Sequence, residues 1–143
     1  MMGKSILLVE DSRDAVELSR NALEGCVYPE GLVVAYDGAE ALEYLSGTGK
    51  YEGRNLNEMP DLILLDLRLP KKSGFEVLEW IRKEQRTKHI PVVILSVSNF
   101  PADIQKAYEL GANSYVRKPG DFDEYISFLK KGCDYWLHVN LKV

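Results

Sequence analysis

The sequence of 143 residues has no hydrophobic run long enough to cross a membrane. Its longest apolar stretches, such as residues 62–65, fall far short of the roughly 20 apolar residues that a spanning helix needs. Residues 1–5 also lack the apolar segment of a secretory signal peptide. We therefore expect a cytoplasmic protein that does not bind membranes.

Cysteine is scarce, and positive charge is not in excess. Cys26 and Cys133 lie far apart without a partner motif, so neither a disulfide framework nor a zinc site is predicted. The formal net charge of −4 argues against binding to nucleic acids or anionic membranes, because both require dense positive charge. The 45% hydrophobic content suffices for one domain over residues 1–143, with a core at about 4–137 and a tail at 138–143.

Five short apolar runs rich in Val, Ile and Leu alternate with segments of helical spacing, and each run is typical of a strand buried on both faces. The runs cover residues 6–9, 32–36, 62–65, 92–95 and 115–116. The pair Asp37-Gly38 predicts the start of the second helix, and Gly47 and Gly111 predict the ends of two others. Residues 122–137 predict a fifth helix. This order indicates an α/β fold with a mostly parallel sheet and helices on both faces.

Polar and charged residues follow four of the five predicted strands. Glu10 and Asp11 follow the first, Asp66 the third, Ser96 the fourth and Lys118 the fifth. Open parallel sheets bind their ligands at the carboxyl ends of the strands, so we expect these side chains to meet. Three crowded carboxylates repel one another unless a cation neutralises them, and their hard oxygen atoms suit Mg²⁺.

A phosphoryl group is the ligand that this combination of residues favours, because Mg²⁺, Lys118 and Ser96 can stabilise its oxygens. Asp66 is the candidate nucleophile, since an ionised carboxylate can form an acyl phosphate without a separate base. Each residue alone also has a structural interpretation. The pair Glu10-Asp11 can interact favourably with the dipole at a helix start, and Asp66 can be a turn residue. Ser96 can bond to the backbone at a strand end, and Lys118 can be a solvated loop lysine. Their combination at four strand ends favours the chemical site.

These residues resemble the receiver domain of two-component response regulators, from about residue 4 to residue 137. The resemblance rests on ILLVEDS (6–12), LILLDLRLPKKSG (62–74), VVILSVS (92–98), LGA (110–112) and SYVRKP (114–119). The spacing from Asp66 to Ser96 and on to Lys118 matches the family as well. The resemblance implies a flavodoxin-like, doubly wound five-stranded parallel sheet of order 2-1-3-4-5 with five helices.

By this resemblance, Asp66 accepts a phosphoryl group from a histidine kinase, and the chain catalyses only its own phosphorylation and dephosphorylation. Mg²⁺ is then held by Glu10, Asp11, Asp66 and the main-chain carbonyl of Arg68. Glu10 stands where aspartate is more frequent in the family. Arg68 and Ser98 flank the site at positions where family members tune the lifetime of the phosphate, although an exposed arginine in a turn is the simpler interpretation of Arg68.

The same resemblance assigns the phosphoryl oxygens to Ser96 and Lys118. Ser96 and Tyr115 are the implied switch residues, which couple the site to the surface of the fourth helix, the fifth strand and the fifth helix. The bond between Lys118 and Pro119 is the implied cis peptide, since only X–Pro bonds make the cis form accessible.

No output domain is expected after the fifth helix, so the chain resembles stand-alone regulators paired with bacterial phytochromes, and the implied partner is a phytochrome-like sensor histidine kinase. The 14 residues 47–60 form either a functional loop or a floppy insertion. The surface around the fourth helix, fifth strand and fifth helix is the candidate homodimer contact, and packing within the chain is the alternative for its aromatic and apolar residues. These candidates are Tyr125, Phe128, Trp136 and Val139.

The main alternative is a receiver-shaped scaffold that works largely without phosphorylation. A haloacid-dehalogenase-like phosphatase requires a second acid where Arg68 stands. A nucleotide hydrolase requires a phosphate-binding loop that Gly49-Lys50 does not complete. A flavodoxin-like electron carrier is disfavoured because the pair Glu10-Asp11 would repel the phosphate of its flavin.

Overall fold

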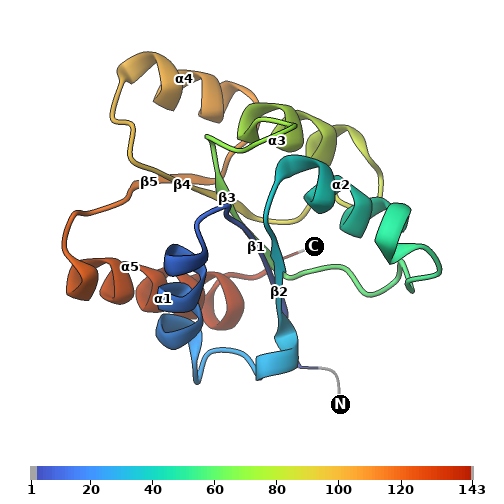
Figure 1. Ribbon diagram of the computed structural model, residues 1–143, viewed down its shortest axis with the longest axis horizontal. Coiled ribbons are helices and arrows are strands. Elements are labelled where there is room, and N and C mark those ends of the chain that lie inside the picture. The colour runs from blue at the N-terminus through green and yellow to red at the C-terminus, as the bar shows by residue number, and fades with distance from the viewer. Residues whose placement is uncertain (1–2, 143) are drawn as a thin grey trace.

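The computed structural model describes residues 3–142 and builds them around one five-stranded sheet (Figure 1). The strands are β1 (Ile6–Val9), β2 (Leu32–Ala35), β3 (Leu62–Asp66), β4 (Val92–Ser96) and β5 (Ser114–Arg117). Neighbouring strands are all parallel, and their order is β2-β1-β3-β4-β5. The predicted sheet and its strand order are confirmed.

Helices cover both faces of this sheet. They are α1 (Arg13–Leu23), α2 (Gly38–Ser46), α3 (Gly74–Lys83), α4 (Pro101–Glu109) and α5 (Phe122–Asp134). Helices α1 and α5 lie on one face, and α2, α3 and α4 lie on the other (Figure 1). The doubly wound architecture follows, since parallel strands need crossovers that return along either face. Within residues 3–142, no helix has both the length and the apolarity to cross a membrane.

Side-chain caps fix where the helices begin. The Ser12 hydroxyl accepts a hydrogen bond from the Ala15 amide at 3.2 Å, and the Asp37 carboxylate accepts one from Glu40 at 2.7 Å. These oxygens satisfy amides that the first turn leaves without a partner. Gly47 ends α2 in the left-handed conformation at φ 69°, which costs glycine little because it has no Cβ. The predicted cap at Asp37 and stop at Gly47 are confirmed.

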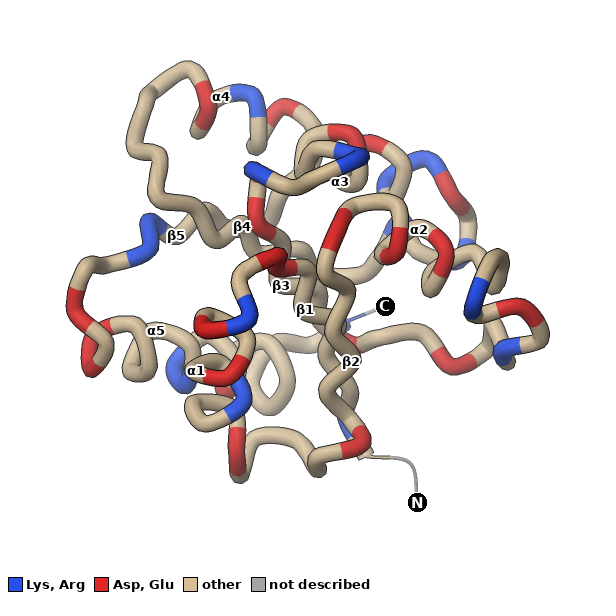
Figure 2. The backbone as a smooth tube through the Cα atoms, in the orientation of Figure 1, with Lys and Arg blue, Asp and Glu red and all other residues tan. Residues whose placement is uncertain are grey.

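The sheet separates two apolar layers, which explains why the strands are continuously hydrophobic. One layer packs beneath α2, α3 and α4 and includes Leu7, Val9, Ile63, Leu65 and Ile94. The other packs beneath α1 and α5 and includes Ile6, Leu8, Leu62, Leu64 and Leu95. Each fully buried side chain of this size contributes about 1.5–3 kcal/mol. Figure 2 shows charged residues on the helices and loops, with the strands largely free of them except at their ends.

The C-terminal part differs from the prediction in two ways. After α5 the chain continues as a π-helix, Tyr135–Val139, so helical structure extends beyond residue 137. Tyr125 is buried in the core with its hydroxyl 3.3 Å from the Ser19 hydroxyl, so its assignment to a dimer contact is wrong. Phe128 and Val139 are exposed and Trp136 is half-buried. Tyr125 faces the core because it lies on the same stripe of α5 as Leu129 and Cys133.

The long segment 47–60 is packed rather than floppy. It contains a 3₁₀ turn, Gly49–Tyr51, whose tyrosine ring meets the Tyr44 ring edge to face at 5.0 Å. The Arg54 guanidinium lies 3.9 Å from the centre of the Tyr44 ring and donates hydrogen bonds to the carbonyls of Tyr44 and Glu58 at 2.8 and 2.7 Å. The segment is therefore fixed against α2.

Candidate functional site

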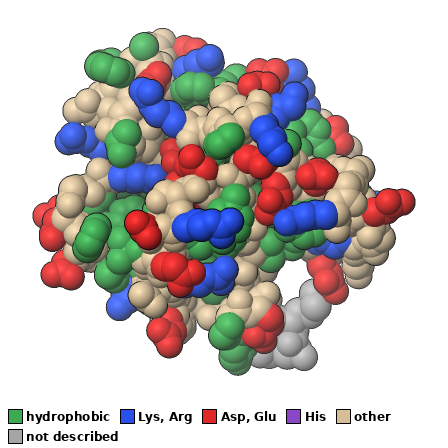
Figure 3. Space-filling view, viewed as in Figure 1, with side chains coloured by type: hydrophobic (Ala, Val, Ile, Leu, Met, Phe, Trp, Pro, Cys, Tyr) green, Lys and Arg blue, Asp and Glu red, His purple; other side chains and the backbone are tan. Residues whose placement is uncertain are grey.

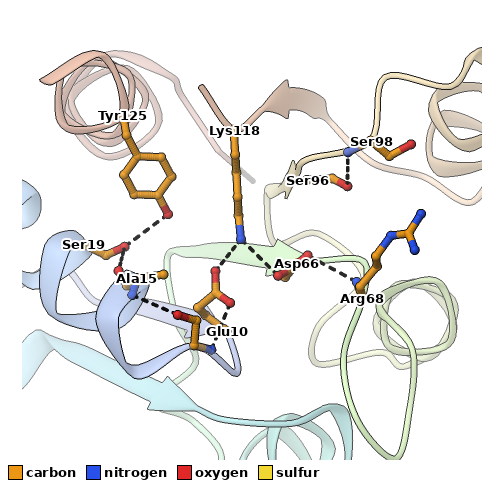
Figure 4. Close-up of polar contacts among 10 residues, drawn as sticks. Glu10, Ala15, Ser19, Asp66, Arg68, Ser96, Ser98, Lys118 and Tyr125 are labelled. Atoms are coloured by element: carbon orange, nitrogen blue, oxygen red, sulfur yellow. Dashed lines mark hydrogen bonds and ion pairs between the residues drawn. The ribbon is translucent and has the colours of Figure 1, made fainter. Parts of the chain in front are cut away.

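The carboxyl ends of β1, β3, β4 and β5 converge at one edge of the sheet and bring the predicted site residues together (Figure 4). Glu10 follows β1, Asp66 ends β3, Ser96 ends β4 and Lys118 follows β5. Parallel pairing brings strand ends to a common edge, so residues distant in sequence become neighbours. On the face drawn in Figure 3, acidic and basic side chains are interspersed rather than segregated.

Lys118 connects this site across the sheet. Its ammonium lies 2.5 Å from the Glu10 carboxylate and 3.0 Å from the Asp66 carboxylate. Its main-chain amide donates to the Ser96 carbonyl at 2.7 Å, which fixes the start of the side chain beside β4. The lysine that follows β5 therefore contacts the residue after β1 and the last residue of β3, as predicted from the strand-end pattern.

Three carboxylates form a cluster that fits a divalent cation. Glu10 is 2% exposed and Asp66 is 9% exposed, whereas Asp11 is exposed at the rim. One oxygen of each lies within 4.8 Å of the others. Lys118 is the positive group bonded to this cluster, so net negative charge remains. Hard oxygen ligands and excess negative charge are what Mg²⁺ requires.

Main-chain amides hold the two buried carboxylates in place. The Ser12 amide donates to Glu10 at 3.2 Å. The Arg68 amide donates to Asp66 at 3.2 Å (Figure 4). The Arg68 side chain is exposed and makes none of the described ion pairs, which agrees with the simpler interpretation of this residue. The role of its carbonyl in metal binding stays a prediction.

Burial and charge act in opposite directions on the ionisable groups. Burial raises the pKa of Glu10; the bond to Lys118 lowers it in part, and Asp66 raises it further, so the net shift is upward. Burial lowers the pKa of Lys118, but the combined effect of Asp66 and Glu10 is larger and the net pKa is raised. Lys118 is therefore held as an ammonium at neutral pH.

Ser96 is linked to α4 and β5 through Ser98. The Ser98 amide donates to the Ser96 hydroxyl at 3.1 Å. The Ser98 hydroxyl donates to Asp103 at 2.6 Å and accepts from the Phe100 amide at 3.2 Å. The Tyr115 hydroxyl donates to the Ser98 carbonyl at 2.9 Å. A continuous set of hydrogen bonds therefore joins the site to the first turn of α4 and to the predicted switch tyrosine.

The predicted cis bond between Lys118 and Pro119 is wrong for this structure. No peptide bond among residues 3–142 is cis. The trans form, which is favoured by about 0.5–1 kcal/mol even before proline, is the one that the structure adopts.

Sequence reasoning missed the close packing around the loop after β3. A Cβ on Gly74 would lie 2.2 Å from the Asp66 carbonyl, and one on Gly38 would lie 2.0 Å from the Lys72 carbonyl. Both glycines therefore let backbone approach the segment that carries Asp66. Their places at the starts of α3 and α2, next to capping residues, were the only local signal of this packing.

A family model described as the response regulator receiver domain matches residues 6–130. The response regulator Rcp1 of Synechocystis sp. is 37% identical over 136 residues, which cover 95% of this chain and 90% of Rcp1. The match therefore includes all the strands and all the predicted site residues.

Solved structures agree with this match. The phosphorylated cyanobacterial phytochrome response regulator RcpA is 38% identical, with a TM-score of 0.91 and coverage of 99% of both chains. The Mn²⁺-bound form of Rcp1 is 36% identical, with a TM-score of 0.88 and coverage of 98% of this chain and 99% of that chain. The chain thus resembles proteins of nearly its own length.

Proposed function

Because this chain belongs to the response regulator receiver domain family, we propose that it accepts a phosphoryl group on Asp66 in a Mg²⁺-dependent reaction. The donor is a phosphohistidine of a sensor histidine kinase. The observation that carries the proposal is the meeting of Asp66 with two further carboxylates and Lys118 at one edge of the sheet. This is the arrangement that phosphoryl transfer requires.

Asp66 acts as the nucleophile. One carboxylate oxygen accepts from the Arg68 amide and the other from the Lys118 ammonium, so the carboxylate is oriented before the donor arrives. An oxygen of Asp66 attacks phosphorus, the new P–O bond forms, and the P–N bond to the donor imidazole breaks. The electron pair of that bond leaves with the imidazole, and an acyl phosphate remains on Asp66.

Glu10, Asp11, Asp66 and the main-chain carbonyl of Arg68 are the groups proposed to hold Mg²⁺. When bound, the ion supplies positive charge against the phosphoryl oxygens. The relative Rcp1 has been solved in a Mn²⁺-bound form, which supports a divalent metal in this chain as well.

Lys118 and Ser96 stabilise the phosphoryl oxygens after transfer. Lys118 is already bonded to Asp66 and supplies a charged donor. The Ser96 hydroxyl accepts from the Ser98 amide, so its own proton is free for a phosphoryl oxygen. Movement of Ser96 toward the phosphoryl group would shift Ser98, and with it Tyr115 and α4. The surface of α4, β5 and α5 then differs between the two states.

The proposed partners follow from the relatives. RcpA is a phytochrome response regulator and AtBRR is a bacteriophytochrome response regulator, which supports a phytochrome-like kinase as the source of the phosphoryl group. We propose that the protein works in the cytoplasm, because sensor histidine kinases take their phosphoryl groups from ATP there. Exposed apolar side chains on α5 and the π-helix, among them Phe128 and Val139, support a homodimer through the surface of α4, β5 and α5.

Intact mass after incubation with acetyl phosphate tests the phosphorylation. Wild type with Mg²⁺ is expected to gain one phosphoryl group, whereas Asp66→Asn, or wild type with excess EDTA, gains none. Asp14→Asn serves as the matched control, because Asp14 is an exposed carboxylate on α1 outside the cluster. Absence of any gain in folded wild type that binds Mg²⁺, even when a histidine kinase is added as donor, would support the scaffold function instead.

A further inference from the structure

A buried hydrogen bond joins the two helices that cover one face of the sheet. The Tyr125 hydroxyl, on α5, lies 3.3 Å from the Ser19 hydroxyl on α1, and both residues are buried (Figure 4). Within residues 3–142 this is the one side-chain hydrogen bond between α1 and α5. No step of the proposed phosphoryl transfer uses it.

The direction of this bond follows from the single proton of a hydroxyl group. The Ser19 hydroxyl donates its proton to the Ala15 carbonyl at 2.8 Å, so the Tyr125 hydroxyl donates to Ser19. Burial raises the pKa of Tyr125, and the opposing effects of Ser19 and Lys118 are smaller. The tyrosine therefore keeps the proton that it donates.

The same part of α1 holds one of the site carboxylates. The Ala15 amide donates to the Ser12 hydroxyl at 3.2 Å. The Ser12 amide in turn donates to the Glu10 carboxylate at 3.2 Å. A series of hydrogen bonds therefore runs from Tyr125 on α5, through the first two turns of α1, to a buried carboxylate of the cluster.

Two of the three carboxylates depend on where α1 begins. Glu10 and Asp11 directly precede Ser12, the N-cap of α1, whereas Asp66 is the last residue of β3. One oxygen of each carboxylate lies within 4.8 Å of the others. A shift of α1 along the sheet would change these separations, and with them the fit to a cation.

We propose that Tyr125 is a positioning residue for the site that holds Mg²⁺. Its hydroxyl acts through Ser19 and keeps the start of α1, with its two carboxylates, aligned with Asp66. Loss of a group that orients a metal ligand typically weakens metal binding by about 10- to 100-fold, and Tyr125 acts at a greater distance from the ligands, so its effect is smaller. This inference rests on the proposed function, because it takes the carboxylate cluster to be the metal site.

Isothermal titration of the unphosphorylated full chain with Mg²⁺ tests this role. Tyr125→Phe removes only the hydroxyl and is expected to weaken Mg²⁺ binding by about 3- to 10-fold. Thr87→Val is the matched control, because it removes another buried hydroxyl, which donates to the Ile81 carbonyl at 2.7 Å outside the site. It is expected to lower the midpoint of thermal unfolding and to bind Mg²⁺ as wild type does.

A double variant tests whether the effect passes through Ser19. Ser19→Ala is expected to weaken Mg²⁺ binding at least as much as Tyr125→Phe does. Addition of Tyr125→Phe to Ser19→Ala is expected to change the affinity by less than about twofold further, because the tyrosine hydroxyl then has no partner on α1. Losses that simply add would overturn the proposed route.

Phosphorylation by acetyl phosphate gives a second readout. Tyr125→Phe is expected to react more slowly than wild type at low Mg²⁺ and at the wild-type rate once Mg²⁺ saturates, whereas impaired folding would lower the rate at every Mg²⁺ concentration. Equal Mg²⁺ affinities of Tyr125→Phe and wild type would overturn this inference and leave the proposed function intact. A wild type that binds Mg²⁺ but is never phosphorylated would overturn the proposed function, and the affinities would still decide the role of Tyr125.

Discussion

At the residue scale, Lys118 controls the charge balance of the site. Its ammonium bonds to both buried carboxylates, Glu10 and Asp66, and so occupies oxygens that belong to the proposed metal site. A bound cation and this ammonium repel each other and compete for the same oxygens. The lysine that is proposed to stabilise the phosphoryl group should therefore weaken metal binding in the unphosphorylated protein.

We expect Lys118→Met to bind Mg²⁺ more tightly than wild type, by about 3- to 10-fold, which corresponds to about 0.7–1.4 kcal/mol. Phosphorylation by acetyl phosphate should instead slow at least about tenfold, because the charged donor to the phosphoryl oxygens is lost. Isothermal titration and intact mass measure the two effects. Arg117→Met removes an exposed cation next to the same position and should change neither. Weaker Mg²⁺ binding in Lys118→Met would contradict the competition.

Residues whose role depends on a strand end were predictable from the sequence. Glu10, Asp66, Ser96 and Lys118 each follow a recognisable apolar run, and parallel pairing places them together. The packing of Cys26 against the apolar cluster that contains Cys133 was not predictable in this way. It depends on how far two helices extend along one face, and local patterns carry no information on that distance.

At the element scale, the start of α4 depends on the Ser98 side chain. Its hydroxyl accepts from the Phe100 amide and donates to the half-buried Asp103 carboxylate. Removal of the hydroxyl leaves both groups without this partner. The cost of such unpaired groups is about 1–3 kcal/mol.

We therefore expect Ser98→Ala to lower the free energy of unfolding by about 1–3 kcal/mol. Urea denaturation followed by circular dichroism measures the loss. Asn99→Ala, at an exposed position in the same loop, should change stability by less than about 0.5 kcal/mol. Equal stabilities of the two variants would show that the Ser98 bonds do not stabilise α4.

The start of α2 is pressed against the loop that follows Asp66. The Gly38 amide donates to the Pro70 carbonyl at 3.3 Å, and Asp37 pairs with Lys71 at 3.5 Å. Lys71 has a φ of 67°, a strained value for a residue with a side chain. The absence of a Cβ at Gly38 allows this approach.

We expect Gly38→Ala to destabilise the protein by about 1–3 kcal/mol, because the new methyl group collides with the Lys72 carbonyl. Gly132→Ala is the matched control: it lies inside α5 with no heavy atom within 4 Å of its Cβ position. That substitution should stabilise the protein by about 0.5–1 kcal/mol. Thermal unfolding distinguishes the two, and a stabilised Gly38→Ala would contradict the packing described.

Elements with a strong local signal were predicted well, whereas their irregular continuations were not. The caps at Asp37 and Gly47 follow from side-chain and backbone preferences of single residues. The π-helix after α5 and the packing of Arg54 on Tyr44 depend on contacts made only in the folded chain. The burial of Tyr125 has the same origin, because an aromatic stripe can face either the core or a partner.

At the scale of the whole molecule, the exposed apolar residues of the C-terminal helices predict self-association. Phe128 is 44% exposed and Val139 is 60% exposed. We expect the weight-average mass of wild type to rise with protein concentration in analytical ultracentrifugation. Phe128→Glu with Val139→Glu should weaken this association at least about tenfold, because two charges would be desolvated at the contact.

Tyr28→Glu is the matched control, since Tyr28 is an exposed aromatic residue at the other end of α1 from the site. Its association should equal that of wild type. A monomeric wild type at all concentrations, phosphorylated or not, would contradict the proposed homodimer.

The position of Lys118 after Asp66 in the sequence also matters while the protein is being made. Glu10 and Asp66 leave the ribosome first, and Lys118 follows Asp66 by 52 residues, which takes about 3–10 s at about 5–20 residues per second. During this interval Glu10 after β1 and Asp66 at the end of β3 lack the ammonium that pairs with them, because Lys118 has not been synthesised. We expect these strands to dock fully only after β5 emerges, so that the assembly of the acidic edge is among the last events of folding.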